Sequence, residues 1–223
     1  MKKEFSTFND MQYIITYPDD YKDGEKRPIL FYLHGAGTRG EDIKKLEANV
    51  FFEEIKKVKN FPFIVISPLC KDTWYDVLER LKKFVITMSN QSFADKKHIY
   101  AMGASMGGYG VWQLGMSLAE IFAGIVPICG GGLYWDAVKL KNVPVWAFHG
   151  ELDVLVYPEE SIKMVRKVNE CGGNAKLTLL PDVYHDAWLS AFSNQEVYDW
   201  LLSNENKNEK TIENLYNDSK LFG

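Results

Sequence analysis

Apolar residues are distributed along this chain in two alternating patterns. Short runs rich in apolar and β-branched residues are typical of strands, and runs with almost no polar interruption indicate strands buried on both faces. Between these runs, apolar residues recur at every third or fourth position, which is typical of helices with one buried face. The runs predict strands at 11–17, 28–33, 61–67, 99–102, 124–129, 143–148 and 176–180. The recurrence predicts helices at 42–58, 74–88, 109–119, 158–170 and 186–202.

Strands that alternate with helices form a mainly parallel sheet, because each right-handed crossover returns the chain to the same end of the sheet. We therefore expect an α/β fold with a mainly parallel central sheet, helices on both faces and no large lid domain. The 223 residues fit one such domain, expected at 1–203. The polar residues 204–223 are expected to form a mobile tail, in which a short helix could dock through Leu215, Tyr216, Leu221 and Phe222.

A serine stands among glycines where the predicted strand 99–102 meets the predicted helix 109–119. The segment Gly103-Ala-Ser-Met-Gly107 matches the pattern Gly-x-Ser-x-Gly. On a tight strand-to-helix turn, this pattern exposes the serine hydroxyl above the edge of a sheet, where it can act as a nucleophile. The sequence therefore predicts Ser105 as a catalytic nucleophile, with a purely structural glycine-rich turn as the alternative.

A serine hydroxyl needs a general base, and histidine is the usual one. Proteins of this fold type carry the nucleophile, the acid and the histidine in that chain order. Of the four histidines, only His149 and His185 follow Ser105. His149 closes a predicted strand, which indicates a structural role at the strand end. His185 lies in a turn-rich loop between the last predicted strand and the last predicted helix, so we predict it as the base, with a solvated loop histidine as the alternative.

The base needs a carboxylate that fixes its tautomer, and the oxyanion formed during the reaction needs two N–H donors. Asp153 follows the sixth predicted strand and is the expected acid, with Glu151 as the alternative. The backbone N–H of Met106, directly after the serine, is one expected oxyanion donor. The other is the backbone N–H of Ala36, in the loop after the second predicted strand.

The same early loop also matches a different kind of site. Gly35-x-Gly37-x-x-Gly40 follows a predicted strand and has the glycine pattern of dinucleotide-binding sites. Such sites also need an acid at the end of the next strand to hold a ribose. Glu53 and Glu54 fall within a predicted helix instead, so we expect no cofactor. No group of histidines, cysteines and carboxylates has metal-ligand spacing, so we expect no metal.

Charge and hydropathy argue against several classes of partner. The formal net charge is −4 and no stretch is strongly basic, so we expect neither nucleic acid nor an anionic membrane surface as a partner. No apolar run reaches the length of a membrane span, and the first residues lack the apolar centre of a signal peptide. We therefore expect a cytoplasmic protein, or a secreted one if a leader has been removed. The three cysteines lack metal-type spacing and are expected to be reduced thiols.

Several segments together resemble the α/β-hydrolase superfamily, and within it the small lidless esterases that group with predicted peptidases, phospholipase/carboxylesterases and feruloyl or polyhydroxybutyrate esterase-like proteins. The resemblance extends over 13–200 and rests on Tyr17-Pro18, Leu33-His-Gly-Ala-Gly-Thr-Arg-Gly-Glu-Asp42, Ser67-Pro-Leu-Cys70, Trp74, Gly103-Ala-Ser-Met-Gly-Gly-Tyr-Gly110, Pro127-Ile-Cys-Gly-Gly131, Val143-Pro-Val-Trp-Ala-Phe-His-Gly150, Asp153 and His185-Asp-Ala-Trp188. It implies a triad and two oxyanion amides at Ser105, Asp153, His185, Ala36 and Met106. The chain departs from many relatives at Val111, where they have Thr, and at Val156-Tyr-Pro158, where they have Val-Pro.

These residues lead us to expect a serine carboxylesterase that acts on a small-molecule ester through an acyl-enzyme. Nearby aromatic residues favour an aromatic or short acyl group, such as those on plant cell-wall carbohydrate. The pocket walls are expected among Trp188, Tyr109 and Trp74, with Tyr134 and Trp135 as further candidates. A serine peptidase or an acyltransferase would use the same residues, and a catalytically silent binding protein is the non-enzyme alternative. The oligomeric state does not follow from the sequence.

Overall fold

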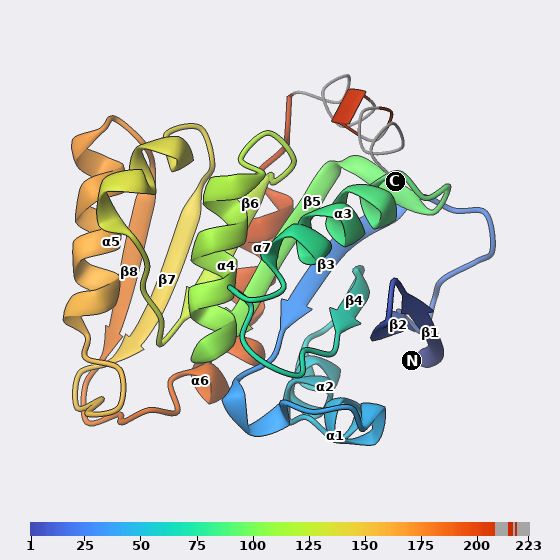
Figure 1. Ribbon diagram of the computed structural model, residues 1–223, viewed down its shortest axis with the longest axis horizontal. Coiled ribbons are helices and arrows are strands. Elements are labelled where there is room, and N and C mark those ends of the chain that lie inside the picture. Colours follow the sequence, from blue (N-terminus) through green and yellow to red (C-terminus); the bar gives the residue numbers. More distant parts are fainter. Residues whose placement is uncertain (208–213, 216, 218–223) are drawn as a thin grey trace.

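Across the residues that the computed structural model describes, which are 1–207, 214, 215 and 217, eight strands form one sheet (Figure 1). The sheet has the strand order β1-β2-β4-β3-β5-β6-β7-β8. The pairs β1–β2 and β2–β4 are antiparallel, and every other neighbouring pair is parallel. The expected mainly parallel α/β sheet is therefore confirmed. The strands are β1 Lys2–Phe8, β2 Met11–Tyr17, β3 Arg27–Leu33, β4 Ile64–Pro68, β5 Ala94–Ala104, β6 Gly124–Ile128, β7 Val145–Gly150 and β8 Ala175–Leu180.

Helices cover both faces of this sheet. Figure 1 shows α3, α4 and α5 in front of it and α7 behind it. No helix among the described residues is long and apolar enough to span a membrane. The α-helices are α1 Ile43–Glu47, α2 Phe51–Glu54, α3 Leu78–Ser89, α4 Met106–Ser117, α5 Glu159–Glu170, α6 Trp188–Phe192 and α7 Gln195–Leu202. Three short 3-10 helices are η1 Ala36–Thr38, η2 Ile55–Lys57 and η3 Tyr134–Leu140.

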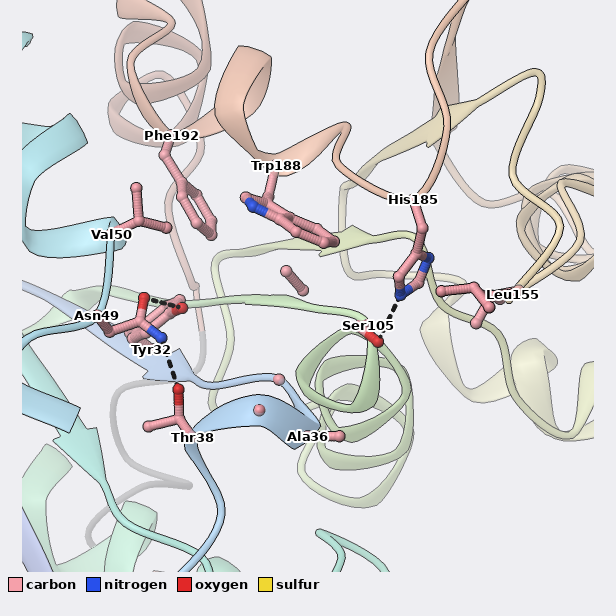
Figure 2. A pocket seen from close by; sticks show the side chains of 14 residues that line it. Tyr32, Ala36, Thr38, Asn49, Val50, Ser105, Leu155, His185, Trp188 and Phe192 are labelled. Carbon is pink, nitrogen blue, oxygen red and sulfur yellow. Dashed lines mark hydrogen bonds between the residues drawn. The ribbon is translucent and has the colours of Figure 1, made fainter. Parts of the chain in front are cut away.

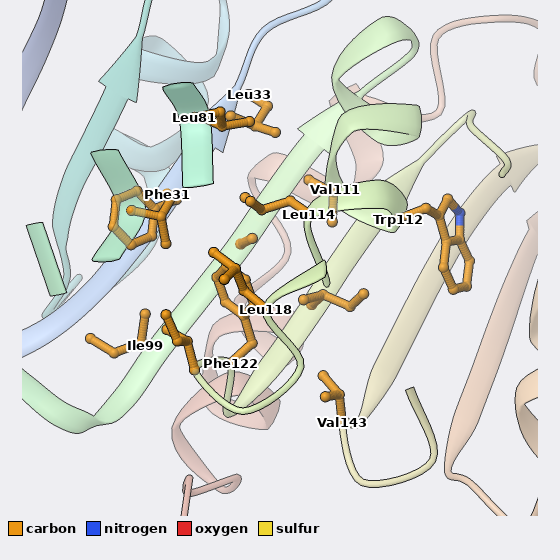
Figure 3. Close-up of a cluster of buried hydrophobic side chains, with 14 of the residues drawn as sticks. Phe31, Leu33, Leu81, Ile99, Val111, Trp112, Leu114, Leu118, Phe122 and Val143 are labelled. Atoms are coloured by element: carbon orange, nitrogen blue, oxygen red, sulfur yellow. The ribbon is translucent and has the colours of Figure 1, made fainter. Parts of the chain in front are cut away.

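Alternate residues of the central strands point to opposite faces of the sheet, and each face has its own apolar cluster. On β3, Phe31 and Leu33 belong to the cluster that contains Leu114 of α4 (Figure 3). Leu30 and Tyr32 of the same strand belong to the cluster on the other face. Burial on both faces explains why this strand is a continuous apolar run in the sequence.

The expected helix at 42–58 is wrong, because the chain forms α1, α2 and η2 in succession. Between α1 and α2, the side chain of Asn49 accepts a hydrogen bond from the backbone N–H two residues on, at 3.0 Å. An asparagine that binds a backbone N–H in this way begins a new helix instead of continuing the previous one. The expected helix at 186–202 breaks for the same reason at Asn194, which caps α7.

Strand β1 is not predicted by the sequence. Its residues, KKEFSTF, are exposed or half-buried and lack an alternation of apolar and polar positions. The strand lies at the edge of the sheet and pairs with β2 alone. Charged edge strands of this kind protect a sheet from pairing with other chains. Because they have few buried apolar residues, the pattern of apolar positions does not predict them.

The chain that follows α7 is fastened to the domain by hydrogen bonds. The hydroxyl of Tyr100 donates to the carbonyl oxygen of Asn204 at 2.8 Å. Asn206 is buried, and its side-chain amide donates to the carbonyl oxygens of Glu120 and Ile121 at 2.6 and 2.8 Å. The first residues of the expected tail therefore contact the domain. The part of the expected tail that lies outside the described residues is 208–213, 216 and 218–223.

The substitution Asn206→Ala should lower the free energy of unfolding by about 2 kcal/mol, because one buried and one partly buried carbonyl group lose their donor. Urea denaturation measures this difference. The neighbouring exposed Lys207→Ala is the matched control and should change stability by less than about 0.5 kcal/mol. Equal stability of both variants and the parent would show that this segment is not anchored.

Candidate active site

Ser105 occupies the turn between β5 and α4 in a strained backbone conformation. Its φ of 56° and ψ of −120° lie in a region that residues other than glycine rarely adopt. The turn fits only because its neighbours lack side chains: a Cβ on Gly107 would collide with the carbonyl oxygen of Leu33, and one on Gly108 with that of Ile128. The Ser105 N–H donates to the Ile128 carbonyl at 2.9 Å, which fixes the turn to β6. This is the geometry that the Gly-x-Ser-x-Gly pattern predicts.

The structure brings Ser105, His185 and Asp153 together in one hydrogen-bonded chain. Nε2 of His185 lies 2.8 Å from Oγ of Ser105 (Figure 2). Nδ1 of His185 lies 2.6 Å from Oδ2 of Asp153. Because a carboxylate only accepts, Nδ1 carries the hydrogen and Nε2 is left to accept from the serine hydroxyl. Oγ of the serine therefore faces the lone pair of a base that is already oriented.

Asp153 is held as a carboxylate inside the protein. It is 2% exposed, and its Oδ1 accepts from the backbone N–H groups of Leu155 and Val156 at 3.0 Å each. Burial acts to raise its pKa, but the hydrogen bonds from His185 and from the two amides outweigh burial and hold the pKa below its usual value. The alternative acid, Glu151, is exposed in the same loop and does not take part in this chain.

His149 has the strand-end role that the sequence predicts for it. It is fully buried, and its Nδ1 and Nε2 lie 2.7 Å from Oγ of Ser161 and 2.8 Å from the carbonyl oxygen of Val156. Oγ of Ser161 also lies 2.8 Å from the carbonyl oxygen of Gly130. His149 thus connects the Asp153 loop to α5 and to the end of β6. Burial lowers the pKa of His149 and outweighs the opposing effects of the Val156 carbonyl and the Asp153 carboxylate.

A second buried histidine, His34, orients the loop that contains Ala36. Its Nε2 accepts from the backbone N–H of Cys70 at 2.9 Å, so Nδ1 carries the hydrogen and donates to the carbonyl of Gly35 at 2.8 Å. The C=O and N–H of one trans peptide point in opposite directions. The Gly35 carbonyl therefore points toward His34, and the N–H of Ala36 points away from it.

The two expected oxyanion donors stand at the beginnings of two helical segments. Met106 is the first residue of α4 and Ala36 the first of η1, so neither N–H has a partner within its own helix. The loop lies against the serine turn, since a Cβ on Gly35 would lie 3.6 Å from Cβ of Ser105. Ala36 and Ser105 also line the same cavity. The assignment of the two amides as oxyanion donors stays a prediction.

A cavity of about 530 Å³ opens beside Ser105 (Figure 2). Trp188 forms part of its wall next to the base, where its ring lies 5.3 Å from that of His185 and almost perpendicular to it, at 88°. Most of the other lining residues are small or apolar. The full lining is Tyr32, Gly35, Ala36, Gly37, Thr38, Asn49, Val50, Ala104, Ser105, Leu155, Val156, His185, Trp188 and Phe192.

Of the expected pocket residues, Trp188 lines this cavity, whereas Trp74 and Tyr109 do not. Trp74 is 1% exposed, packs against Gly110 in α4 and donates from its indole nitrogen to the carbonyl of His34 at 3.0 Å. Its role is therefore to support the Ala36 loop from within the core. Burial and the nearby carboxylate of Glu160 raise the pKa of Tyr109 to about 12.

The sequence does not predict the far wall of the cavity, which is formed by Tyr32, Thr38, Asn49, Val50 and Phe192. These residues come from β3, η1, the start of α2 and α6, which are distant in sequence. Only two of these residues could be predicted from their positions in the sequence. Thr38 follows the expected oxyanion loop directly, and Phe192 follows Trp188 by one helical turn. Tyr134 and Trp135 are exposed on η3 and pack against each other.

Among the described residues, one group of side chains could hold a metal ion. Its members are Cys129, Asp153 and His185, whose potential ligand atoms lie within 4.8 Å of one another. Two of these are already hydrogen-bonded to each other. Burial, followed by the nearby Asp153 carboxylate, raises the pKa of the Cys129 thiol to about 12. Because the Asp153 and His185 atoms that would bind a metal already bind each other, the group fits the hydrogen-bonded chain better than a metal.

The glycine pattern at 35–40 does not fold as a dinucleotide site. After β3 the chain enters η1, which has three residues, instead of a helix whose N-terminus could hold a pyrophosphate. A Cβ on Gly37 or Gly40 would meet nothing within 4 Å, so these glycines do not form a tight cradle. The loop fits the role of oxyanion loop better.

No family model matches this chain, and the comparison with curated proteins returned no match. Among solved structures, a thermostable esterase has a TM-score of 0.81 and 29% sequence identity over 91% of this chain. This chain spans 63% of that esterase. Est1E from Butyrivibrio proteoclasticus has a TM-score of 0.70 and 16% identity over 90% of this chain and 98% of its own. A feruloyl esterase module from Clostridium thermocellum, in complex with sinapinate, has a TM-score of 0.66 and 15% identity over 88% of this chain and 86% of its own.

These likenesses extend over about nine-tenths of the chain and include the sheet and the helices on both of its faces. The segments that the sequence analysis relates to the α/β-hydrolase superfamily lie within the same region. In the described residues, no insertion between the strands forms a large lid. The chain therefore has the α/β-hydrolase fold.

Proposed function

We propose that this protein is a serine carboxylesterase that hydrolyses a carboxylic ester through an acyl-enzyme. One observation carries the proposal: the hydrogen-bonded chain from Ser105 through His185 to Asp153 ends beside a largely apolar cavity. A nucleophile, an oriented base and a buried carboxylate in this order are the requirements of acyl transfer. The likeness to a thermostable esterase supports the same class of reaction.

In the first half of the reaction, Oγ of Ser105 attacks the ester carbonyl while Nε2 of His185 takes the hydroxyl proton. The carboxylate of Asp153 stabilises the imidazolium that forms. The amides of Ala36 and Met106 donate to the oxyanion, and each such donor is typically worth about 3 to 4 kcal/mol of transition-state stabilisation. His185 then protonates the leaving alcohol, and the acyl group stays on Oγ.

In the second half, water takes the place of the alcohol. Nε2 of His185 removes a proton from this water, and the resulting hydroxide attacks the acyl carbonyl. The same two amides hold the second oxyanion. Return of the proton to Oγ of Ser105 releases the carboxylic acid and restores the starting state.

The proposed substrate is a small ester with an aromatic or short acyl group, such as those attached to plant cell-wall carbohydrate. The apolar walls formed by Trp188, Phe192, Val50 and Leu155 support an acyl group with an apolar body. The feruloyl esterase module and Est1E, which share the fold, agree with this substrate class but do not define it.

The substitution Ser105→Ala should lower kcat by about 10⁴-fold or more, because no other group can form the acyl-enzyme. The assay is hydrolysis of a chain-length series of p-nitrophenyl esters and of methyl ferulate by the parent and the variant. Equal turnover by both proteins would exclude Ser105 as the nucleophile. Turnover of matched amides, or transfer to added alcohols, in place of ester hydrolysis would favour a peptidase or an acyltransferase.

The substitution Asp153→Asn should lower kcat by about 10³- to 10⁴-fold, since an amide cannot stabilise the His185 imidazolium. The matched control is Glu151→Gln in the same loop, which should keep the parent rate within about twofold because its side chain is exposed. Steady-state kinetics at pH 8 measure both variants. A large loss in Glu151→Gln with little loss in Asp153→Asn would reassign the acid.

The stability that His34 contributes should depend on pH. Burial lowers its pKa from 6.5 to about 4, so the unfolded chain binds this proton first. Its contribution is complete above about pH 6.5 and is lost as the pH falls to about 4, a change of up to about 3 kcal/mol. Urea denaturation of the parent and of His34→Gln should therefore give a stability difference that shrinks over this range. A difference that is independent of pH would contradict a buried neutral His34.

A further inference from the structure

The end of the cavity farthest from the serine is polar. Three residues form this polar end: Tyr32, Thr38 and Asn49. Figure 2 shows them on the opposite side of the cavity from Ser105 and His185. An acyl group attached to Ser105 that extends along the cavity therefore meets hydrogen-bonding groups at its far end.

Hydrogen bonds connect the three residues of the polar end and use part of their donors and acceptors. Oδ1 of Asn49 accepts from the Tyr32 hydroxyl at 2.9 Å and from the N–H of Phe51 at 3.0 Å, so both of its lone pairs are used. Nδ2 of Asn49 donates to Oγ1 of Thr38 at 2.9 Å. The Thr38 hydroxyl is thus an acceptor toward Asn49, and among the described residues no acceptor is found for its own hydrogen. That hydrogen is available to a ligand in the cavity, as is the second hydrogen on Nδ2 of Asn49.

The polar end is also rigid. The ring of Tyr32 stacks on that of Phe51, with centroids 3.8 Å apart and planes within 5°. The N–H of Thr38 donates to the carbonyl of Gly35 at 3.2 Å, within the same turn that presents the N–H of Ala36. The proposed oxyanion donor and the Thr38 hydroxyl therefore have a fixed spatial relation, and they can contact two positions of one acyl group.

The lining also restricts the charge of the ligand. It contains no aspartate, glutamate, lysine or arginine. Figure 2 shows Trp188 and Phe192 on the wall between His185 and Val50. A charged group in such a cavity would lose its hydration without a partner. The Thr38 hydrogen therefore fits an uncharged oxygen, as in a hydroxyl, an ether or a carbonyl group.

We propose that the cavity binds the acyl group of the substrate and that Thr38 selects acyl groups with an uncharged oxygen substituent at their far end. The proposal rests on the function proposed above and adds the chemistry of the acyl group to it. Thr38 is a specificity residue here, because it contacts the substrate away from the reacting atoms.

The test compares esters that differ only in a distal oxygen. One suitable comparison is p-nitrophenyl hexanoate with the esters in which an ether oxygen replaces one CH₂ group of the acyl chain. The other is p-nitrophenyl 3-phenylpropanoate with p-nitrophenyl 3-(4-hydroxyphenyl)propanoate. For at least one pair, the parent should have a kcat/KM about tenfold higher for the oxygenated ester, the value of one hydrogen bond. An ester with a distal carboxylate should be a poorer substrate than either member of the pair.

The Thr38→Val substitution should bring the ratio of the two kcat/KM values close to one, because valine keeps the shape and removes the hydroxyl. Thr38→Ser keeps the hydroxyl and should keep the preference. Thr7→Val, the same exchange on the exposed strand β1, is the matched control and should keep the parent ratio.

Two results would overturn the proposal while ester hydrolysis stands: a parent without preference for any oxygenated ester, or the same preference in Thr38→Val. The first result can be obtained even if Thr38→Val does not fold, because it needs only the parent protein. Absence of Ser105-dependent hydrolysis for every ester would instead overturn the proposed function, and the selectivity of Thr38 would fall with it.

Discussion

The site depends on the backbone of one residue. Ser105 is held at a φ of 56°, a conformation that costs a residue other than glycine about 1 to 3 kcal/mol. Close packing sustains it, since the neighbouring glycines lie against the carbonyl groups at the ends of β3 and β6. The strain raises Oγ above the carboxyl ends of the parallel strands, where loops from several strands converge. Every other part of the site is arranged around that atom.

Three histidines near this turn have separate tasks that follow from their burial. His34 and His149 are completely buried, their pKa values are lowered by burial, and each fixes the loop that carries one functional group. His34 orients the peptide that presents Ala36, and His149 fastens the loop of Asp153. His185 keeps a partly exposed side chain, so it is the one of the three that can exchange a proton with a ligand in the cavity.

The sequence predicts the parts of this structure that depend on local pattern. Strand β3 is a continuous apolar run because both faces of the sheet are covered, and the turn at Ser105 has a glycine pattern because its packing excludes side chains. The helix expected at 42–58 is wrong because a single asparagine side chain caps a backbone N–H. The cavity wall could not be predicted, because residues such as Thr38 and Phe192 meet only after the chain has folded. Trp74 is predicted as a pocket residue, but its ring packs in the core, where Gly110 leaves space for it.

Trapping of the acyl-enzyme tests the central claim most directly. The parent protein is mixed with an excess of p-nitrophenyl ester, quenched in acid within milliseconds, and analysed by intact-mass and peptide mass spectrometry. The account predicts one acyl group per chain, on the peptide that contains Ser105, formed together with a burst of p-nitrophenol. Turnover without a covalent adduct, or an adduct on a different residue, would contradict it.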